Sequence, residues 1–335
     1  MDSTEIRLAS RPERRAKPTD FAAATVPVPA PGPGQVQVRN SFLSVDPYMR
    51  GRMNDVPSYV PPFALGEALT GGAVGRVVAS ESSDVPVGAL VSSMFGWREA
   101  FTVDAAAVQV LPEPPQGVAE SAYLGVLGMP GMTAWVGVTQ IAPVHEGDAV
   151  FVSGASGAVG SVAGQLARAR GASLVVGSAG APEKVTAVRD EFGFDDCFSH
   201  LDGEPLPHLR RLAPNGIDMY FDNVGGAQLA AALVVLRPFG RAALCGAIST
   251  GYDGTPGAPV ATMGLVVGKR LTLRGFIVSD HTDLQSAFLA EVGALLAGGR
   301  LVFRETVAKG IASAPEAFLA LFEGGGQIGK VVVAV

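Results

Sequence analysis

Ala149–Ser161, with the sequence AVFVSGASGAVGS, is the stretch that decides the fold of this chain. Residues 149–153 form an apolar run of strand length. The following turn, of the pattern A-x-G-x-x-G, opens a helix-like segment that runs through Arg170 and stops at Gly171. A glycine-rich turn that follows a strand and opens a helix is the context that a dinucleotide-binding fingerprint requires. The sequence therefore predicts a strand–turn–helix unit that holds a pyrophosphate.

Small residues in this turn each have a physical reason. Gly157 lets a pyrophosphate approach the backbone closely, and Gly160 lets the helix pack tightly on the strand. Ala155 stands where the first glycine of the fingerprint is usual, and its small side chain still permits a tight turn. Free amides and the helix dipole then favour negative charge at the helix start. The residues predicted to bind the cofactor here are Ala155, Ser156, Gly157, Ala158, Val159 and Gly160.

The next apolar run bears on the choice of cofactor. Sites for NAD generally place Asp or Glu about twenty residues after the glycine turn, where it binds the ribose 2′-hydroxyl. Residues 177–180 read GSAG, include Ser178, and offer no carboxylate, whereas Lys184 follows close behind and can reach a 2′-phosphate. NADPH is therefore favoured over NADH, although Glu183 leaves NADH open.

Strands and helices alternate on both sides of this turn. Further strands are predicted at Ser173–Val176, Ile217–Phe221, Arg241–Cys245 and Leu271–Val278, with helices from Pro182 and over Ala227–Leu236. Continuous apolar strands that alternate with helices predict a parallel sheet covered on both faces. Residues 1–120 carry short runs such as Gln35–Arg39, typical of antiparallel strands. Short strands return after residue 300, at Arg304–Val307 and Gly329–Val333, around a helix at Ala314–Phe322.

Composition limits the classes of function. The 335 residues suggest two domains, and 48% hydrophobic and 17% charged residues are typical of a compact globular protein. A formal net charge of −6 gives no overall attraction to nucleic acid or to anionic membranes. No apolar run reaches the roughly 18 residues of a spanning helix, and the start lacks the features of a secretory signal. We therefore expect a cytoplasmic protein without nucleic-acid or membrane partners.

Metal chemistry is not expected. Residues 1–144 contain neither Cys nor His, and the four histidines of the chain lack ligand spacing. The two cysteines, Cys197 and Cys245, lie in apolar contexts and do not form a disulfide scaffold. Without a metal, alcohol oxidation lacks its usual way of stabilising the alkoxide, whereas hydride addition to a conjugated double bond needs placement and a proton donor.

Five segments, in the order that the family has them, resemble the medium-chain dehydrogenase/reductases. The resemblance is specifically to the leukotriene B4 dehydrogenase/prostaglandin reductase branch, which includes plant double-bond reductases and bacterial curcumin reductases. The five segments are Leu43–Arg50, Gly128–Ala134, the glycine-rich turn, Phe221–Gly226 and Cys245–Thr250. The resemblance implies an α/β protein with a GroES-like, β-rich catalytic domain and a doubly wound Rossmann domain. It assigns residues 1–125 to the catalytic domain, 126–298 to the Rossmann domain and 299–335 to a return into the catalytic domain, and it implies a homodimer.

The resemblance also implies a set of residues around NADPH. Lys184 would hold the 2′-phosphate, with His200 where the family often has Tyr. Gln327 stands where Asn is usual. The remaining residues expected at the cofactor are Met132, Thr133, Ser178, Asn223, Cys245, Gly246, Ala247, Ile248, Ser249, Phe276, Ile277 and Val278. A partly protonated imidazole at His200 would strengthen the preference for NADPH near neutral pH.

The predicted reaction is reduction of the carbon–carbon double bond of an α,β-unsaturated aldehyde or ketone. Hydride goes to the β-carbon, and a proton goes to the α-carbon. Tyr48 is the first candidate for a hydrogen bond to the carbonyl oxygen, and Tyr252 is the second; Gly251 intervenes where the family has Tyr directly. The loop 252–260 is a candidate lid. The alternatives are that both rings only line the site, that the enzyme reduces quinones or ketones, or that the chain binds NADPH without turnover.

Overall fold

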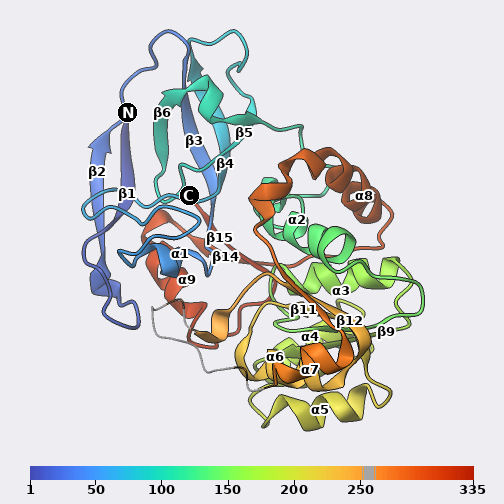
Figure 1. The fold of residues 1–335 in the computed structure, drawn as a ribbon. Helices are drawn as coiled ribbons and strands as arrows, with labels where there is room; N and C mark the ends of the chain where they lie inside the picture. Colours follow the sequence, from blue (N-terminus) through green and yellow to red (C-terminus); the bar gives the residue numbers. More distant parts are fainter. Residues whose placement is uncertain (251, 253–259, 261) are drawn as a thin grey trace.

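Two β-sheets organise the chain in the computed structural model, which describes residues 1–250, 252, 260 and 262–335. One sheet has six strands and is built from the middle of the chain. The other has seven strands and combines residues from both ends of the sequence (Figure 1). The α/β fold class predicted from the sequence is confirmed.

The six-stranded sheet is parallel throughout, in the order β10-β9-β8-β11-β12-β13. The chain starts at β8 in the middle, adds β9 and β10 on one side, and then returns to add the other three strands. Such a reversal opens a crevice at the carboxyl ends of the two central strands. The strands are β8 (Ala149–Val152), β9 (Leu174–Ala179), β10 (Asp196–Ser199), β11 (Ile217–Asp222), β12 (Leu236–Leu244) and β13 (Thr272–Gly275).

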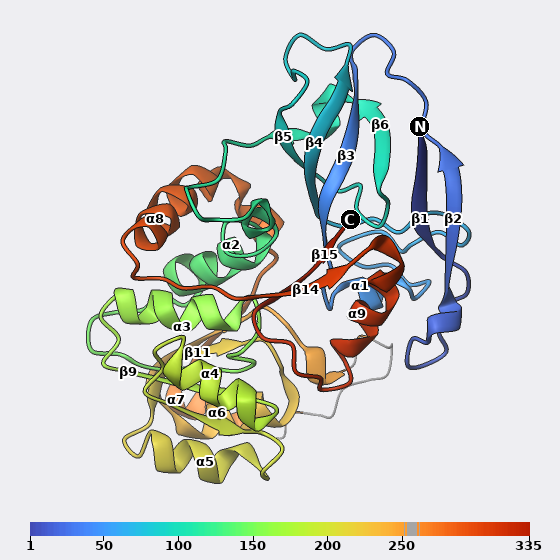
Figure 2. The same cartoon turned by 180° about the vertical axis from the view of Figure 1, so that it is seen from behind.

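Helices cover both faces of this sheet because alternate strand residues point in opposite directions. Val150 and Val152 pack with residues of α2, α3, α4 and α8, whereas Phe151 packs with residues of α5 and α6. Figure 2 shows α2 beside α3, with α8 next to α2. These helices are α2 (Met129–Val136), α3 (Gly160–Ala169), α4 (Pro182–Asp190), α5 (Pro205–Leu212), α6 (Gly226–Val235), α7 (Gly264–Lys269) and α8 (Gln285–Ala297).

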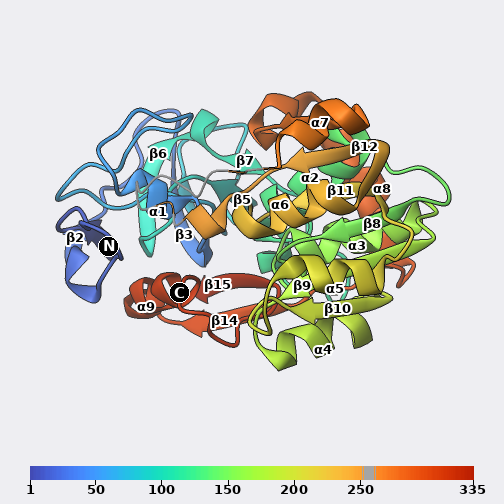
Figure 3. The same ribbon diagram turned by 60° about the horizontal axis from the view of Figure 1, so that its bottom comes forward.

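The seven-stranded sheet joins the two ends of the chain. Its order is β14-β15-β3-β4-β5-β7, with β6 also paired to β3, and β15 is antiparallel to β3. In Figure 3, β14, β15 and α9 lie in the same part of the molecule as the N-terminal strands. The elements are β1 (Asp2–Leu8) and β2 (Phe21–Pro27), which form a separate ribbon, then β3 (Gln35–Ser44), α1 (Met49–Arg52), β4 (Ala73–Ser80), β5 (Leu90–Ser93), β6 (Ala100–Asp104), β7 (Gln109–Val110), β14 (Glu305–Lys309), α9 (Ala314–Ala320) and β15 (Lys330–Ala334).

A buried ion pair fastens β15 to the end of β3. The ammonium of Lys330 donates to Oδ1 of Asp46 at 2.7 Å and to the carbonyl of Val45 at 2.9 Å. The two side chains are only 4% and 8% exposed. The other carboxylate oxygen of Asp46 accepts a hydrogen bond from Ser44. Both charges are therefore paired and hydrogen-bonded, as burial requires.

One predicted strand is too long. The sequence predicts a strand over Leu271–Val278, but β13 ends at Gly275 and a 3₁₀ helix begins at Val278. The reason is that β13 is an edge strand, and its neighbour β12 ends at Leu244, which pairs with Gly275. Beyond that point the chain has no neighbouring strand to pair with. The domain boundaries at residues 125 and 298 stay a prediction.

Replacing Lys330 should show how strongly stability depends on an intact buried ion pair. We expect Lys330→Met to lower the free energy of unfolding by about 3–5 kcal/mol, because it leaves the Asp46 carboxylate buried without its partner. Urea denaturation measures this, with Lys309→Met as the control, since Lys309 is exposed on the adjacent strand. Equal urea midpoints for the two variants would contradict the expectation.

Candidate functional site

Most residues predicted to bind the cofactor follow the carboxyl ends of the parallel strands. The glycine-rich turn follows β8, Lys184 follows β9, and His200 follows β10. On the other side of the reversal, Asn223 follows β11, residues 245–249 follow β12, and residues 276–278 follow β13. Because these ends share one edge of the sheet, the fold gathers residues that are up to about 120 positions apart in the sequence.

The glycine-rich turn packs tightly against the protein at Ala155 and Gly160 and leaves backbone accessible at Gly157. Ala155 is completely buried, and Gly177 on β9 provides its space, because a Cβ at Gly177 would lie 2.7 Å from the Ala155 methyl. A Cβ at Gly160 would lie 2.3 Å from the carbonyl oxygen of Gly154. At Gly157 the nearest atom to a built Cβ is 3.4 Å away. Gly160 is thus needed for packing, and Gly157 keeps a surface of backbone accessible.

Segments 222–226 and 245–249 are held together by backbone hydrogen bonds. The amides of Cys245 and Gly246 both donate to the carbonyl of Asp222, at 3.0 and 3.1 Å. The Asn223 amide group donates to the carbonyl of Ser153 at 2.7 Å and accepts from the Cys245 thiol at 3.1 Å. Burial raises the pKa of the Cys245 thiol, which therefore stays protonated. Ala247, Ile248 and Ser249 continue along the same edge, where each is partly or fully exposed.

The buried carboxylate of Asp222 builds the loop that carries Asn223. Its Oδ1 accepts hydrogen bonds from the Tyr220 phenol at 2.7 Å and from the amides of Val224 and Gly225 at 2.9 and 2.7 Å. Hydrogen bonds to a carboxylate are stronger than those between neutral groups. The loop is therefore rigid at the point where β11 ends.

The candidate 2′-phosphate site contains Lys184 and His200. Partial desolvation and the nearby charge of Lys184 lower the pKa of His200, and burial lowers the pKa of Lys184. Burial, followed by the charge of Lys184, thus disfavours the partly protonated imidazole expected from the sequence. Ser178 is fully buried and donates its hydroxyl hydrogen to Gln228, so its side chain is already engaged.

The remaining predicted cofactor residues lie around this edge. Met132 and Thr133 are buried on α2, and the Thr133 hydroxyl donates to the carbonyl of Met129 at 2.8 Å. Gln327 lies in the loop before β15, where its amide folds over Gly325. In the same loop, the amide of Gly329 donates to the carbonyl of Ser156 at 2.8 Å. Phe276, Ile277 and Val278 are partly exposed.

Tyr48 immediately precedes α1 as its N-cap residue and lies two positions after the ion-paired Asp46. Burial, followed by the charge of Asp46, raises the pKa of the Tyr48 phenol. The Arg52 guanidinium stacks 4.0 Å from the centre of the Phe63 ring, and its positive charge partly opposes the rise in the Tyr48 pKa. Arg52 also donates to the carbonyl of Pro61 at 2.9 Å. A phenol of raised pKa stays protonated and can donate its O–H to another partner.

Tyr252 lies close to the same group of side chains. Its phenol oxygen accepts a hydrogen bond from the amide of Ala247 at 3.2 Å, and burial raises its pKa. A Cβ at Gly51 would lie 3.9 Å from the Tyr252 ring, so Tyr252 lies beside α1, the helix that directly follows Tyr48. Gly251 and residues 253–259, which include most of the candidate lid, lie outside the described residues.

Two contacts in this region were not predicted from the sequence. Arg52 stands four positions after Tyr48, a spacing that puts two side chains on one helix face, so the motif offered a signal. Gln228 contacts Ser178 across 50 positions, and no local pattern marks such a pair.

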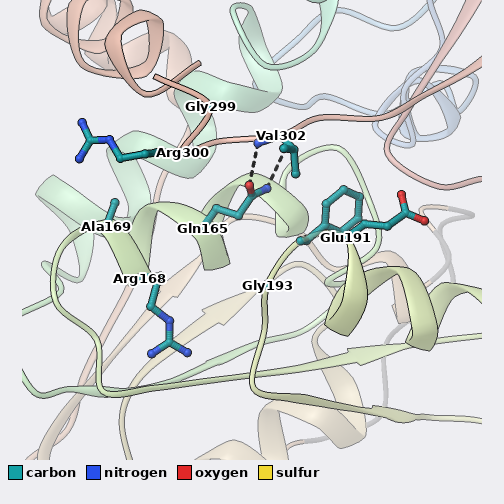
Figure 4. A pocket seen from close by; sticks show the side chains of 9 residues that line it. Gln165, Arg168, Ala169, Glu191, Gly193, Gly299, Arg300 and Val302 are labelled. Atoms are coloured by element: carbon teal, nitrogen blue, oxygen red, sulfur yellow. Dashed lines mark hydrogen bonds between the residues drawn. The ribbon is translucent and has the colours of Figure 1, made fainter. Parts of the chain in front are cut away.

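A separate open pocket of about 400 Å³ contains none of the predicted site residues. Its walls include Arg168, Glu191 and Arg300 (Figure 4). The Gln165 side chain crosses it, donating to the carbonyl of Val302 at 2.9 Å and accepting from its amide at 2.8 Å. This amide clamp ties α3 to the segment that returns to the seven-stranded sheet.

Two features are absent from the part of the chain that the structure describes. No group of three or more His, Cys, Asp or Glu side chains is arranged to hold a metal ion. None of the helices in that part of the chain combines the length and the apolar character that membrane crossing requires.

Comparisons with known proteins agree with this architecture. Residues 4–111 match a family model described as the N-terminal domain of oxidoreductase, and residues 158–293 match one described as zinc-binding dehydrogenase. A 2-alkenal reductase (NADP⁺-dependent) of Nicotiana tabacum is 42% identical over 302 residues, covering 90% of this chain and 87% of that protein. The NADPH-dependent curcumin reductase of Escherichia coli is 38% identical over 334 residues, with 98% and 95% covered.

A solved structure gives the same result. The crystal structure of CurA from Vibrio vulnificus in complex with NADPH superposes with a TM-score of 0.93 at 37% identity, covering 99% of each chain. The chain belongs to the medium-chain dehydrogenase/reductases, in the branch of NADP-dependent oxidoreductases that contains these relatives. The resemblance inferred from the sequence is confirmed.

The two glycines of the turn allow a matched test. We expect Gly157→Ala to keep the melting temperature but to weaken NADPH binding at least about tenfold, because the methyl group fits the protein yet occupies the approach of the pyrophosphate. Gly160→Ala should lower the melting temperature, since its methyl group collides with the Gly154 carbonyl. Thermal unfolding and NADPH fluorescence titration measure both effects. Unchanged NADPH affinity in Gly157→Ala would count against the assigned turn.

Proposed function

We propose that this protein is an NADPH-dependent reductase of the carbon–carbon double bond in α,β-unsaturated aldehydes and ketones. The observation that carries the proposal is the hydrogen bond from the Ala247 amide to the phenol of Tyr252, by which a protonated phenol lies beside residues 245–249. The relatives supply the class of reaction, since one is named a 2-alkenal reductase and another a curcumin reductase.

The residues present fit NADPH. Gly157 leaves backbone accessible for the pyrophosphate, and Lys184 with His200 supplies basic groups for the 2′-phosphate at the end of β9. When bound, NADPH supplies the hydride. The turn, the loop at Asn223 and residues 245–249 orient it along the carboxyl edge of the sheet.

The role of this chain's side chains in the chemical step is electrostatic. Hydride addition at the β-carbon moves negative charge onto the carbonyl oxygen and gives an enolate, which is then protonated at the α-carbon. Tyr48, which burial keeps protonated, donates its O–H to that oxygen as the charge develops. Tyr252 is the second donor. A donor that is fixed before the reaction stabilises the transition state without reorganisation.

Two other functions use the same fold. A quinone or ketone reductase would need the same cofactor site, and an NADPH-binding protein without turnover would need only that site. The double-bond reaction is preferred because the Tyr252 phenol lies beside residues 245–249 and because one relative is named a 2-alkenal reductase. The homodimer and the cytoplasmic location stay predictions.

Product analysis tests the proposed reaction. NADPH oxidation is followed with 2-alkenals, enones, quinones and saturated aldehydes, and the products are identified by mass spectrometry and NMR. Saturated carbonyl products are expected. Allylic alcohols or quinols as the main products, or tight NADPH binding without turnover, would replace the proposal with one of the alternatives.

Lys184 should set the choice between the two dinucleotides. We expect Lys184→Ala to raise the KM for NADPH about 10- to 100-fold and to leave the KM for NADH nearly unchanged, because it removes a charged donor to the 2′-phosphate. Initial rates with both cofactors measure this. Arg189→Ala is the control, since Arg189 lies on the same helix and is exposed. Equal losses with NADPH and NADH would contradict the assignment.

Removal of the Tyr48 phenol should slow the reaction without releasing the cofactor. We expect Tyr48→Phe to lower kcat about 10²-fold while NADPH affinity is kept. Because the pKa of Tyr48 is raised, its protonated form persists to higher pH than that of an ordinary phenol of about 10. Wild-type kcat should therefore show no loss from Tyr48 ionisation up to about pH 9. An alkaline decline below that pH that disappears in Tyr48→Phe would contradict the raised pKa.

A further inference from the structure

Asn54 links α1 to Tyr252 across the two parts of the molecule. Its side-chain Nδ2 donates to the main-chain carbonyl of Tyr252 at 3.0 Å, a contact between residues 198 positions apart. Asn54 follows α1, the helix that Tyr48 directly precedes. One short segment thus carries a candidate hydrogen-bond donor at its start and a contact to the other candidate donor at its end.

The orientation of the Asn54 amide is determined by Arg50. The Arg50 guanidinium donates to Oδ1 of Asn54 at 2.8 Å, and an arginine has no acceptor, so the oxygen of the amide must face it. The amide nitrogen is therefore directed at Tyr252. Arg50 is only 2% exposed and also donates to the carbonyl of Arg14, so it is a fixed support.

Tyr252 has a backbone conformation that needs support. Its φ is +47°, in the left-handed region that side chains other than glycine rarely adopt. Such conformations persist where surrounding contacts determine them. Two contacts are available at Tyr252, the phenol with the Ala247 amide and the carbonyl with Asn54. A Cβ at Gly51 would lie 3.9 Å from the Tyr252 ring, so the ring packs beside α1.

We propose that Asn54 is a positioning residue that holds Tyr252 in its donor orientation. The phenol oxygen already accepts from the Ala247 amide, so its own hydrogen is left to point toward a substrate oxygen beside residues 245–249. Asn54 acts by fixing the main chain of Tyr252 and does not touch the substrate. The assignment rests on the proposed double-bond reduction, in which Tyr252 is a donor.

Two substitutions separate the Tyr252 contact from the Arg50 contact. Asn54→Asp keeps an acceptor for Arg50 but replaces the donor to Tyr252 with a carboxylate oxygen. Asn54→Ala removes both contacts without adding charge. Asp55→Asn is the control, because Asp55 is the next residue, is exposed, and pairs with Arg11.

We expect both Asn54 variants to lower kcat with a 2-alkenal about tenfold, while the NADPH dissociation constant changes less than about twofold. Asp55→Asn should leave both quantities unchanged. In a Tyr252→Phe background, Asn54→Asp should lower kcat by less than about twofold, because residues that act as a unit are not additive. An equal loss in both backgrounds, or no loss in the wild-type background, would overturn the role of Asn54.

A second readout does not depend on turnover. The Ala247 amide is protected by the Tyr252 phenol, so its hydrogen–deuterium exchange should be faster in Asn54→Asp and unchanged in Asp55→Asn. If the wild-type protein reduces no enal, the proposed function fails, and the exchange measurement still tests whether Asn54 holds Tyr252. Unchanged exchange at Ala247 would overturn the positioning role even in an active enzyme.

Discussion

The ion pair between Lys330 and Asp46 is the interaction on which the arrangement of the site depends. Asp46 begins the turn that presents Tyr48, and Lys330 begins the strand that follows Gly329. The Gly329 amide in turn bonds the glycine-rich turn at Ser156. Two adjacent residues near the end of the chain thus contact both the cofactor turn and the tyrosine turn. Because a buried charge without a partner is costly, this ion pair strongly favours one position of the glycine-rich turn relative to the turn that carries Tyr48.

Hydrogen bonds to buried acceptors give the rest of the site its rigidity. The side-chain carboxylate of Asp222 accepts hydrogen bonds from amides of its own loop. Its main-chain carbonyl accepts hydrogen bonds from the amides of Cys245 and Gly246. Small residues are needed here because the two segments lie in direct contact: a Cβ at Gly246 would lie 2.9 Å from the Asn223 carbonyl. The motifs 221–226 and 245–250 therefore have a common physical origin. Each supplies half of one hydrogen-bonded edge beside the cofactor position.

Features that depend on residues adjacent in the chain were predicted from the sequence, whereas features that depend on contacts between distant residues were not. β8, the turn and α3 were predicted because strand, glycines and helix are adjacent in the chain, and the start of α4 at Pro182 is equally local. The end of β13 was wrong because it depends on where the neighbouring β12 stops. Asn54 and Gln228 were missed because their roles come from tertiary contacts between residues 198 and 50 positions apart, whereas Arg52 was missed although its spacing of four positions from Tyr48 offered a signal. The lowered pKa of His200 comes mainly from burial, which only the folded chain produces.

The raised pKa values of the two phenols limit the chemistry that they can perform. Burial makes the charged form of Tyr48 unfavourable, and the carboxylate of Asp46 adds to this effect. A phenol of raised pKa remains a hydrogen-bond donor but gives up its proton less readily. In the proposed double-bond reduction, Tyr48 would therefore stabilise the enolate oxygen and would be poorly suited to transfer a proton to carbon. The α-carbon would then receive its proton from another donor, such as water, while the tyrosines control where negative charge develops.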